Sequence, residues 1–169
     1  MCLKESSIFA RIPGQERILV LPSGLFSNAD KELFDFRDKT VIGFERDEVK
    51  KVEIRSNGNV YVLEKKETEW SIQQPIEAKA DRSEVNTILS DLEFARLEEF
   101  MERGTPLRNY GLKNPRARVD LYLGENQARK TLLVGKKVGE GQYYAKDQSE
   151  EDVFKIKEDL VAKLALDLQ

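Results

Sequence analysis

Residues 51–63 read KVEIRSNGNVYVL, and this stretch decides the fold class. Val52 and Ile54 alternate with charged neighbours, which is the two-residue period of a strand with one face buried and the other in water. Asn57-Gly58 is a dipeptide favoured in two-residue hairpin turns, and apolar residues return directly after it. The stretch therefore predicts an antiparallel β-hairpin.

Further strand-like runs extend this hairpin in both directions. Trp70 and Ile72 predict a third strand, which ends before Pro75. The other apolar or alternating runs are 8–12, 18–21, 119–123, 130–134, 143–145 and 153–156. Many of these runs are separated by short turns rather than by crossover helices, so they predict antiparallel meanders instead of a doubly wound parallel sheet.

Amphipathic helices are expected at three places. Over 81–94, Asp81 can cap the helix and Glu84 follows three positions later. A second helix is predicted over 157–167, and a third stretch begins after Pro22. Its apolar face consists of Leu25, Phe26, Ala29 and Leu33. The fold class predicted is α+β, with antiparallel meanders and two or three helices packed on the sheet.

The end of the chain resembles its beginning. A shift of 135 positions carries Ile8 onto Tyr143 and, with no gap, the run 18–21 onto 153–156. The apolar pattern and the spacing match together, although few residues are identical, which favours a repeat. On this interpretation residues 1–35 are the tail of a preceding unit, a hairpin plus helix, and 36–169 form one complete α+β unit.

Composition excludes several function classes. The 169 residues are 40% apolar and 35% charged with net charge −3, and both signs are interspersed. Nucleic acid is not expected as a partner, because no basic stripe is present. No stretch approaches the roughly 20 apolar residues of a membrane span, so direct membrane insertion by this chain is not expected either. The single cysteine rules out an intramolecular disulfide.

The residues of common catalytic sites are missing. There is no histidine, which removes the commonest general base and metal ligand. The glycines and lysines of 135–139 lack the spacing of a phosphate-binding loop, so a hairpin turn is expected there. We therefore expect no cofactor and no enzyme activity. An enzyme using carboxylates alone is a third alternative, drawing on the acidic runs 45–48, 98–99 and 150–152.

Aromatic residues suggest a binding surface. Tyr143, Tyr144 and Tyr122 lie on strand-like runs, and such side chains are enriched at interaction hot spots. The simpler interpretation is that Trp70 and one of the two neighbouring tyrosines fill the core while strand alternation exposes the other. A small-molecule or glycan-binding domain built on these tyrosines is the alternative function.

Six motifs occur in an order that resembles a known bacterial family. They are Arg37-Asp38-Lys39-Thr40, residues 49–55, Trp70 with Pro75, the helix from Asp81, Tyr110-Gly111-Leu112 and residues 141–145. Together they resemble a domain of unknown function that often occurs in tandem copies. Proteins of that family are membrane-anchored through an N-terminal helix, and some are encoded beside ABC transporters of the gliding-motility type.

The resemblance implies a non-catalytic function. It suggests a non-catalytic interaction or scaffold domain of a bacterial cell-envelope complex, with a protein partner in the membrane. Trp70 and Tyr110 would be structural anchors. Gly111 would allow a backbone conformation that is unfavourable to other residues. Arg37 and Asp38 would be part of the junction between units. The location would be extracytoplasmic if an N-terminal anchor exists and cytoplasmic otherwise. The oligomeric state is left open.

Overall fold

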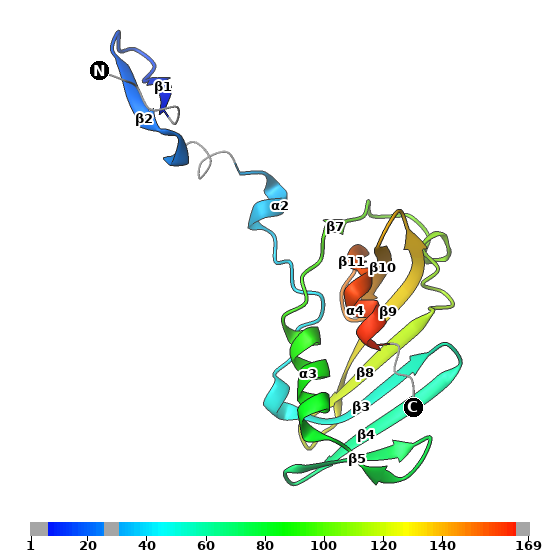
Figure 1. The fold of residues 1–169 in the computed structure, drawn as a ribbon. Coiled ribbons are helices and arrows are strands. Elements are labelled where there is room, and N and C mark those ends of the chain that lie inside the picture. The colour runs from blue at the N-terminus through cyan, green and yellow to red at the C-terminus, as the bar shows by residue number, and fades with distance from the viewer. Residues whose placement is uncertain (1–6, 26–30, 165–169) are drawn as a thin grey trace. The chain divides into compact units, whose positions relative to one another are not determined.

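The computed structural model describes residues 7–25 and 31–164 (Figure 1). Contacts divide the chain into two compact units, residues 1–38 and 39–169, which are described separately below. The larger unit holds an antiparallel sheet with helices on it, and the smaller unit holds a two-stranded antiparallel sheet. The predicted α+β class with antiparallel strands is confirmed.

The larger unit is organised around a nine-stranded sheet with the order β6-β5-β4-β3-β8-β9-β10-β11-β7. Its strands are β3 (Val49–Ser56), β4 (Asn59–Lys66), β5 (Glu69–Gln74), β6 (Ala78–Lys79), β7 (Glu99–Phe100), β8 (Ala117–Leu123), β9 (Ala128–Val138), β10 (Gln142–Asp147) and β11 (Phe154–Lys157). All neighbouring strands in it are antiparallel. The strand β3 stands near the centre, between β4 and β8.

The hairpin predicted at 51–63 is the β3–β4 pair. Asn57 and Gly58 have φ angles of 52° and 83°, the left-handed backbone that a primed two-residue turn requires. The register follows from this turn, with Ser56 opposite Asn59 and Ile54 opposite Tyr61. Val52 and Ile54 are fully buried as predicted, but Glu53, on the face predicted to lie in water, is only 8% exposed.

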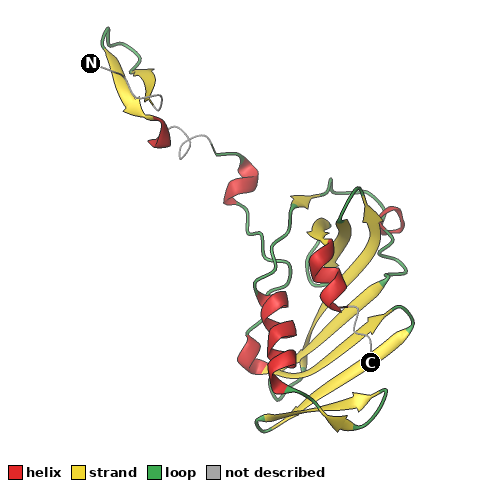
Figure 2. Ribbon diagram, in the orientation of Figure 1, coloured by secondary structure: helices red, strands yellow, loops and turns green. Residues whose placement is uncertain are grey.

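Helices cover one face of this sheet. They are α3 (Arg82–Glu93) and α4 (Glu158–Leu164), and 3-10 turns occur at η1 (Arg46–Glu48) and η2 (Leu107–Tyr110). Figure 2 shows α3 and α4 on the same face. The predicted cap is present, since the Asp81 carboxylate accepts the Ser83 N–H at 2.7 Å. The apolar stripe of α3, made of Val85, Leu89 and Leu92, is buried.

Two local predictions need correction. The strand β9 runs through Gly135 to Val138, and the turn into β10 falls at 139–141 rather than at 135–139. The helix expected from Pro22 to Leu33 is not continuous, because residues 31 and 32 are not helical and the short α2 (Leu33–Phe36) starts after them. Phe26 and Ala29 of that predicted face lie outside the described residues, as does the end of the helix predicted to residue 167.

The smaller unit contains the hairpin of β1 (Ser7–Arg11) and β2 (Ile18–Pro22). In its register Ile8 lies opposite Leu21, and the shift of 135 positions turns this pair into Tyr143 opposite Ile156, which is a pair of β10 and β11. The same shift maps three further pairs of the first hairpin onto pairs of the second. A repeat is expected to give the two hairpins the same register. The division of the chain into repeat units at 35/36 stays a prediction.

Candidate functional site

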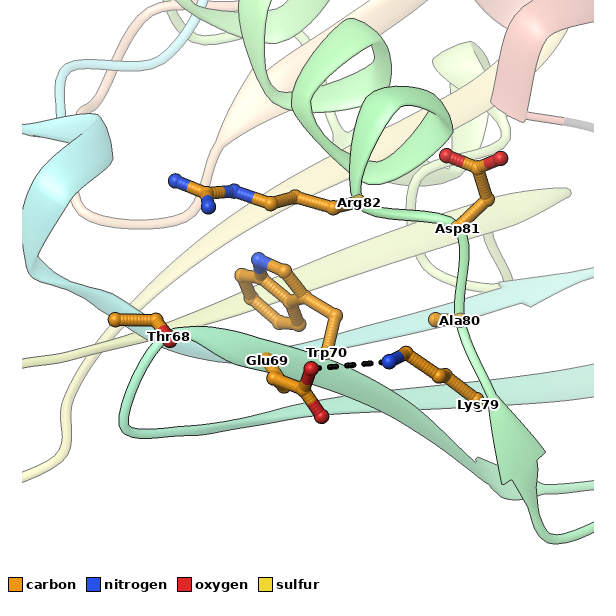
Figure 3. A pocket seen from close by; sticks show the side chains of 7 residues that line it. All are labelled: Thr68, Glu69, Trp70, Lys79, Ala80, Asp81 and Arg82. Carbon is orange, nitrogen blue, oxygen red and sulfur yellow. Dashed lines mark hydrogen bonds and ion pairs between the residues drawn. The ribbon is translucent and has the colours of Figure 1, made fainter.

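A hollow of about 570 Å³ lies where β5, β6 and the start of α3 meet. We call it the Trp70 hollow, and Figure 3 shows the seven residues that line it: Thr68, Glu69, Trp70, Lys79, Ala80, Asp81 and Arg82. Two short chain segments, 68–70 and 79–82, thus form the whole lining. They come together because β6 folds back antiparallel on β5.

Hydrogen bonds hold the two segments in place. The Ala80 N–H donates to the Trp70 carbonyl oxygen at 3.0 Å, directly before the helix begins. Lys79 Nζ lies 2.9 Å from Glu69 Oε1, so these two opposite charges neutralise each other across the strands. The Asp81 carboxylate is engaged in capping α3. The walls are therefore set by main-chain and cap contacts.

Two side chains that line the Trp70 hollow carry hydrogen-bond donors, namely the indole of Trp70 and the guanidinium of Arg82. The Trp70 side chain is packed into the core, with only 3% of the residue exposed. Its indole nitrogen lies on the ring edge that points toward the side chain of Arg82 (Figure 3). Arg82 is exposed. Because indole N–H and guanidinium groups only donate, the arrangement suits an acceptor.

The face of the sheet opposite the helices carries an ion-paired layer. Asp120 on β8 is only 1% exposed, and Arg118 holds its carboxylate with two hydrogen bonds of 2.7 and 2.9 Å. The Thr131 hydroxyl donates to the same carboxylate at 2.6 Å. Glu53 on β3 is likewise paired with Arg55 and accepts from the Tyr122 hydroxyl at 3.4 Å. Asp120 and Glu53 are thus both ion-paired with arginines on the same face.

The pKa of Asp120 reflects this layer. Burial alone raises the pKa of its carboxyl group, because the charged form loses water. The hydrogen bonds from Arg118 and Thr131, together with the positive charges of Arg118 and Arg129, outweigh burial and leave the pKa below its ordinary value. Asp120 is therefore ionised at neutral pH. Its carboxylate accepts the hydrogen bonds that hold the side chains of Arg118 and Thr131 in place.

The sequence matches one family twice. Models of the family described as domain of unknown function (DUF4340) match residues 3–102 and 70–168. The chain belongs to this family. The two matches overlap, since both contain residues 70–102. No curated protein and no solved structure matches the chain. These matches confirm one part of the resemblance seen in the sequence motifs, namely that the chain belongs to an uncharacterised domain family.

Within this DUF4340 chain, the motif Tyr110-Gly111-Leu112 crosses directly over β9. Gly111 has φ 72°, and a Cβ atom there would lie 2.8 Å from the backbone nitrogen of Lys136. A Cβ at Gly135 would lie 2.1 Å from the Tyr110 carbonyl oxygen. The main chains approach this closely only because both positions are glycine. Tyr110 and Leu112 are themselves buried, in a small cluster with Val153.

The three tyrosines predicted as a binding surface are placed in different surroundings. Tyr143 is 5% exposed, and its hydroxyl lies 3.4 Å from Glu158 at the start of α4. Tyr144 is half-buried and packs against Tyr110, with ring centroids 4.8 Å apart. Tyr122 lies on the ion-paired layer, with Lys51 Nζ 5.0 Å from its ring centroid. The structure thus brings Tyr144 and Tyr110 together.

The remaining predicted residues lie at a boundary. Arg37 is half-buried and Asp38 exposed, and the contact division of the chain falls directly after Asp38. Their role as a junction between repeat units stays a prediction. Among the described residues, no helix has the length and apolar character needed to cross a membrane.

Acids in two of the three acidic runs considered for carboxylate chemistry, 98–99 and 150–152, form ion pairs. Glu99 pairs with Lys155 at 2.6 Å and Asp152 with Arg103 at 2.7 Å. Within residues 7–25 and 31–164, no group of three or more His, Cys, Asp and Glu side chains is placed to hold a metal ion.

Sequence reasoning identified Trp70 but missed the rest of the Trp70 hollow. One signal was available in Arg82, which occupies the first position of a helix. A positive charge there opposes the helix dipole, so a functional reason was worth seeking. The other lining residues, such as Thr68 and Lys79, carry no pattern that distinguishes them from ordinary turn and strand residues.

Proposed function

We propose that this DUF4340 chain is a non-catalytic scaffold domain of a bacterial cell-envelope complex associated with an ABC transporter. In this proposal, units of the family join through β-strand addition, and the hairpin β1–β2 completes the sheet of a neighbouring unit. The membrane setting rests on the family resemblance of the motifs. The joining of units rests on the hairpin itself.

The observation that carries the proposal is the apolar surface of this hairpin. Phe9, Ile18 and Val20 are 68%, 66% and 52% exposed. Its counterpart, β10–β11, gains its stability from neighbours, because β10 pairs with β9 and β11 with β7. Within the described residues of its own unit, β1–β2 has no such neighbours. A lone hairpin is marginally stable in water, so it is suited to receive another strand.

The occupant follows from the shared register. The edge of β1 corresponds to the edge of β10, which pairs with the long antiparallel strand β9. We therefore assign to the edge of β1 a β9-type strand from another DUF4340 unit. Two overlapping family matches in one chain support a sequence that carries parts of more than one unit. The neighbouring unit can belong to the same longer protein or to a partner subunit.

Photo-crosslinking in the native bacterium tests this proposal. A crosslinking amino acid replaces Phe9 in one variant and Phe94 in the control, since these residues are almost equally exposed, at 68% and 67%. We expect the Phe9 variant alone to crosslink a DUF4340 sequence in the membrane fraction. An intramolecular product on a species larger than 19.4 kDa would assign the strand to the same protein, and an intermolecular product would assign it to a partner.

Two results would contradict the proposal. One is a soluble, monomeric protein in which Phe9 and Phe94 give the same products. The other is a Phe9 product with a protein that has no DUF4340 unit. An extracytoplasmic location is part of the same proposal, and protection of the protein from protease added outside intact inner membrane vesicles of inverted orientation would support it.

The alternative, a small-molecule or glycan-binding domain built on Tyr143, Tyr144 and Tyr122, stays a prediction. A thermal-shift screen checks it, because a ligand that binds the native state raises the unfolding temperature. Stabilisation that is lost when Tyr144 is changed to Leu would favour it over the scaffold.

A further inference from the structure

Positive charge is concentrated in the two longest stretches of the sequence that contain no Asp or Glu. The first stretch covers residues 103–119 and holds five Lys and Arg residues, and the second covers 126–139 and holds four. The whole chain, by contrast, has a net charge of −3. Within each stretch the cations are spread along the sequence, so only the fold can gather them into one surface.

The fold brings the middle of the first stretch onto the end of the second. At Gly111 a Cβ atom would lie 2.8 Å from the backbone nitrogen of Lys136, and the Gly111 N–H donates to the Arg108 carbonyl oxygen at 3.2 Å. Lys113 follows two positions after Gly111. The crossing therefore gathers the backbone positions of three basic residues around one contact.

Two further cations meet at the ring of Tyr143. Arg116 Cζ and Lys137 Nζ each lie 5.8 Å from the centroid of this ring. We call the five exposed cations of the two stretches that meet here the basic cluster: Arg108, Lys113, Arg116, Lys136 and Lys137. Among the described residues, an ion pair neutralises only Lys137, whose Nζ lies 2.7 Å from Glu158 Oε1. The basic cluster thus presents four positive charges without an ion-pair partner in the described part of the chain.

The borders of the basic cluster select among polyanions. Arg103 lies 2.7 Å from Asp152 and 3.7 Å from Glu151, so acids occupy the beginning of the first stretch and would interrupt a track of nucleic-acid phosphates. Leu107, directly before Arg108, is 40% exposed, and an apolar side chain among cations suits the boundary between lipid headgroups and acyl chains. An anionic bilayer also spreads its charges over a surface, where cations from separate segments can contact them together.

We propose that the basic cluster binds the anionic surface of a lipid bilayer, with its Lys and Arg side chains on headgroup phosphates and Leu107 in the headgroup region. Each Lys or Arg near such a surface contributes about a factor of five to the affinity. The binding is peripheral and requires no segment that crosses the bilayer. This inference goes beyond the proposed scaffold function, because it rests on the basic cluster and the hairpin β1–β2 takes no part in it.

Vesicle co-sedimentation with the full chain tests the proposal. The probes are vesicles of phosphatidylcholine alone and vesicles of phosphatidylcholine and phosphatidylglycerol in equal amounts. We expect the protein to sediment with the anionic vesicles only, because phosphatidylcholine has no net charge. Raising the salt concentration from about 0.1 M to about 1 M shortens the screening length from about 10 Å to about 3 Å and should release the protein.

A triple variant removes the three cations around the crossing: Arg108→Gln, Lys113→Gln and Lys136→Gln. All three side chains are exposed, so the changes are compatible with folding, which circular dichroism checks. The affinity for the anionic vesicles should fall by about a hundredfold. A matched control removes three exposed cations outside both stretches: Lys66→Gln, Arg82→Gln and Arg96→Gln. The control has the same net charge as the triple variant and should keep the affinity of the wild type.

Several results would overturn the inference. One is sedimentation that is equal with neutral and anionic vesicles, or absent with both. Another is an equal affinity of the triple variant and the control for the anionic vesicles. Tighter binding to duplex DNA or to polyglutamate than to the vesicles, compared at equal total negative charge, would assign the basic cluster to nucleic acid or to an acidic protein. Each of these results is independent of whether Phe9 crosslinks a DUF4340 sequence.

Discussion

Gly135→Ala should destabilise the protein, because η2 lies directly on the backbone of β9 at this position. The new Cβ atom would lie 2.1 Å from the Tyr110 carbonyl oxygen and 3.3 Å from Leu112 Cδ2. The obstacle at 2.1 Å is main chain rather than a flexible side chain, so the 107–112 segment must move away. Overpacking of this kind costs about 3 kcal/mol, and the lower chain entropy of alanine in the unfolded state returns about 1 kcal/mol.

The expected net loss is about 2 kcal/mol, or a fall in the melting temperature of about 4–8 °C for a domain of this size. Urea unfolding followed by circular dichroism measures it. Gly43→Ala is the matched control, because a Cβ atom added there would meet no atom within 4 Å and its φ is not in the left-handed region. A Gly135→Ala protein as stable as Gly43→Ala would refute the argument that close main-chain approach requires glycine here.

Two further predictions concern buried side chains. Asp120→Asn should cost about 2–3 kcal/mol at pH 7, since Arg118 loses its anionic partner. The pKa of Asp120 is lowered in the native state, so its contribution is present above the ordinary carboxyl pKa of about 4 and is lost as the pH falls through the native value. Urea unfolding at pH 7 and pH 3 should therefore show the gap between wild type and variant narrowing in acid; a constant gap would contradict the ion pair. Leu89 in α3 is only 1% exposed, so Leu89→Ala should lower the free energy of unfolding, measured by the same assay, by about 2–5 kcal/mol. A loss below about 1 kcal/mol would show that Leu89 does not pack tightly in this core.

Local signals were sufficient to predict much of the fold. The β3–β4 hairpin follows from the alternation of Val52 and Ile54 with charged residues, the turn signal Asn57-Gly58 and the apolar run after it, all within 13 residues. The helix α3 follows in the same way from its cap at Asp81 and an apolar stripe at helical spacing. Such elements are predictable because their causes lie within one stretch of chain.

Features with long-range causes were not predictable. Gly135 was assigned to a turn because glycine commonly occurs in turns, but here it serves the crossing of Tyr110, which lies 25 positions earlier in the sequence. The Trp70 hollow likewise requires residues on both sides of the β5–β6 connection to meet, and only the pairing of those strands brings Arg82 to the indole. The sequence contains the residues of the site, but it does not show which of them lie next to one another in space.

The two hairpins of the chain share a strand register but differ in burial. In the larger unit the inward residues of β10 and β11 include Ala145 and Phe154, which are 0% and 3% exposed. Their counterparts in the smaller unit, Ala10 and Leu19, are only half-buried although the strand register is the same. Register and apolar pattern are properties of the hairpin, whereas burial requires the strand and the helices packed against it. Residues 7–22 therefore carry the register and apolar pattern of the second hairpin without its burial, and our proposal assigns the missing contacts to a strand like β9 from another unit.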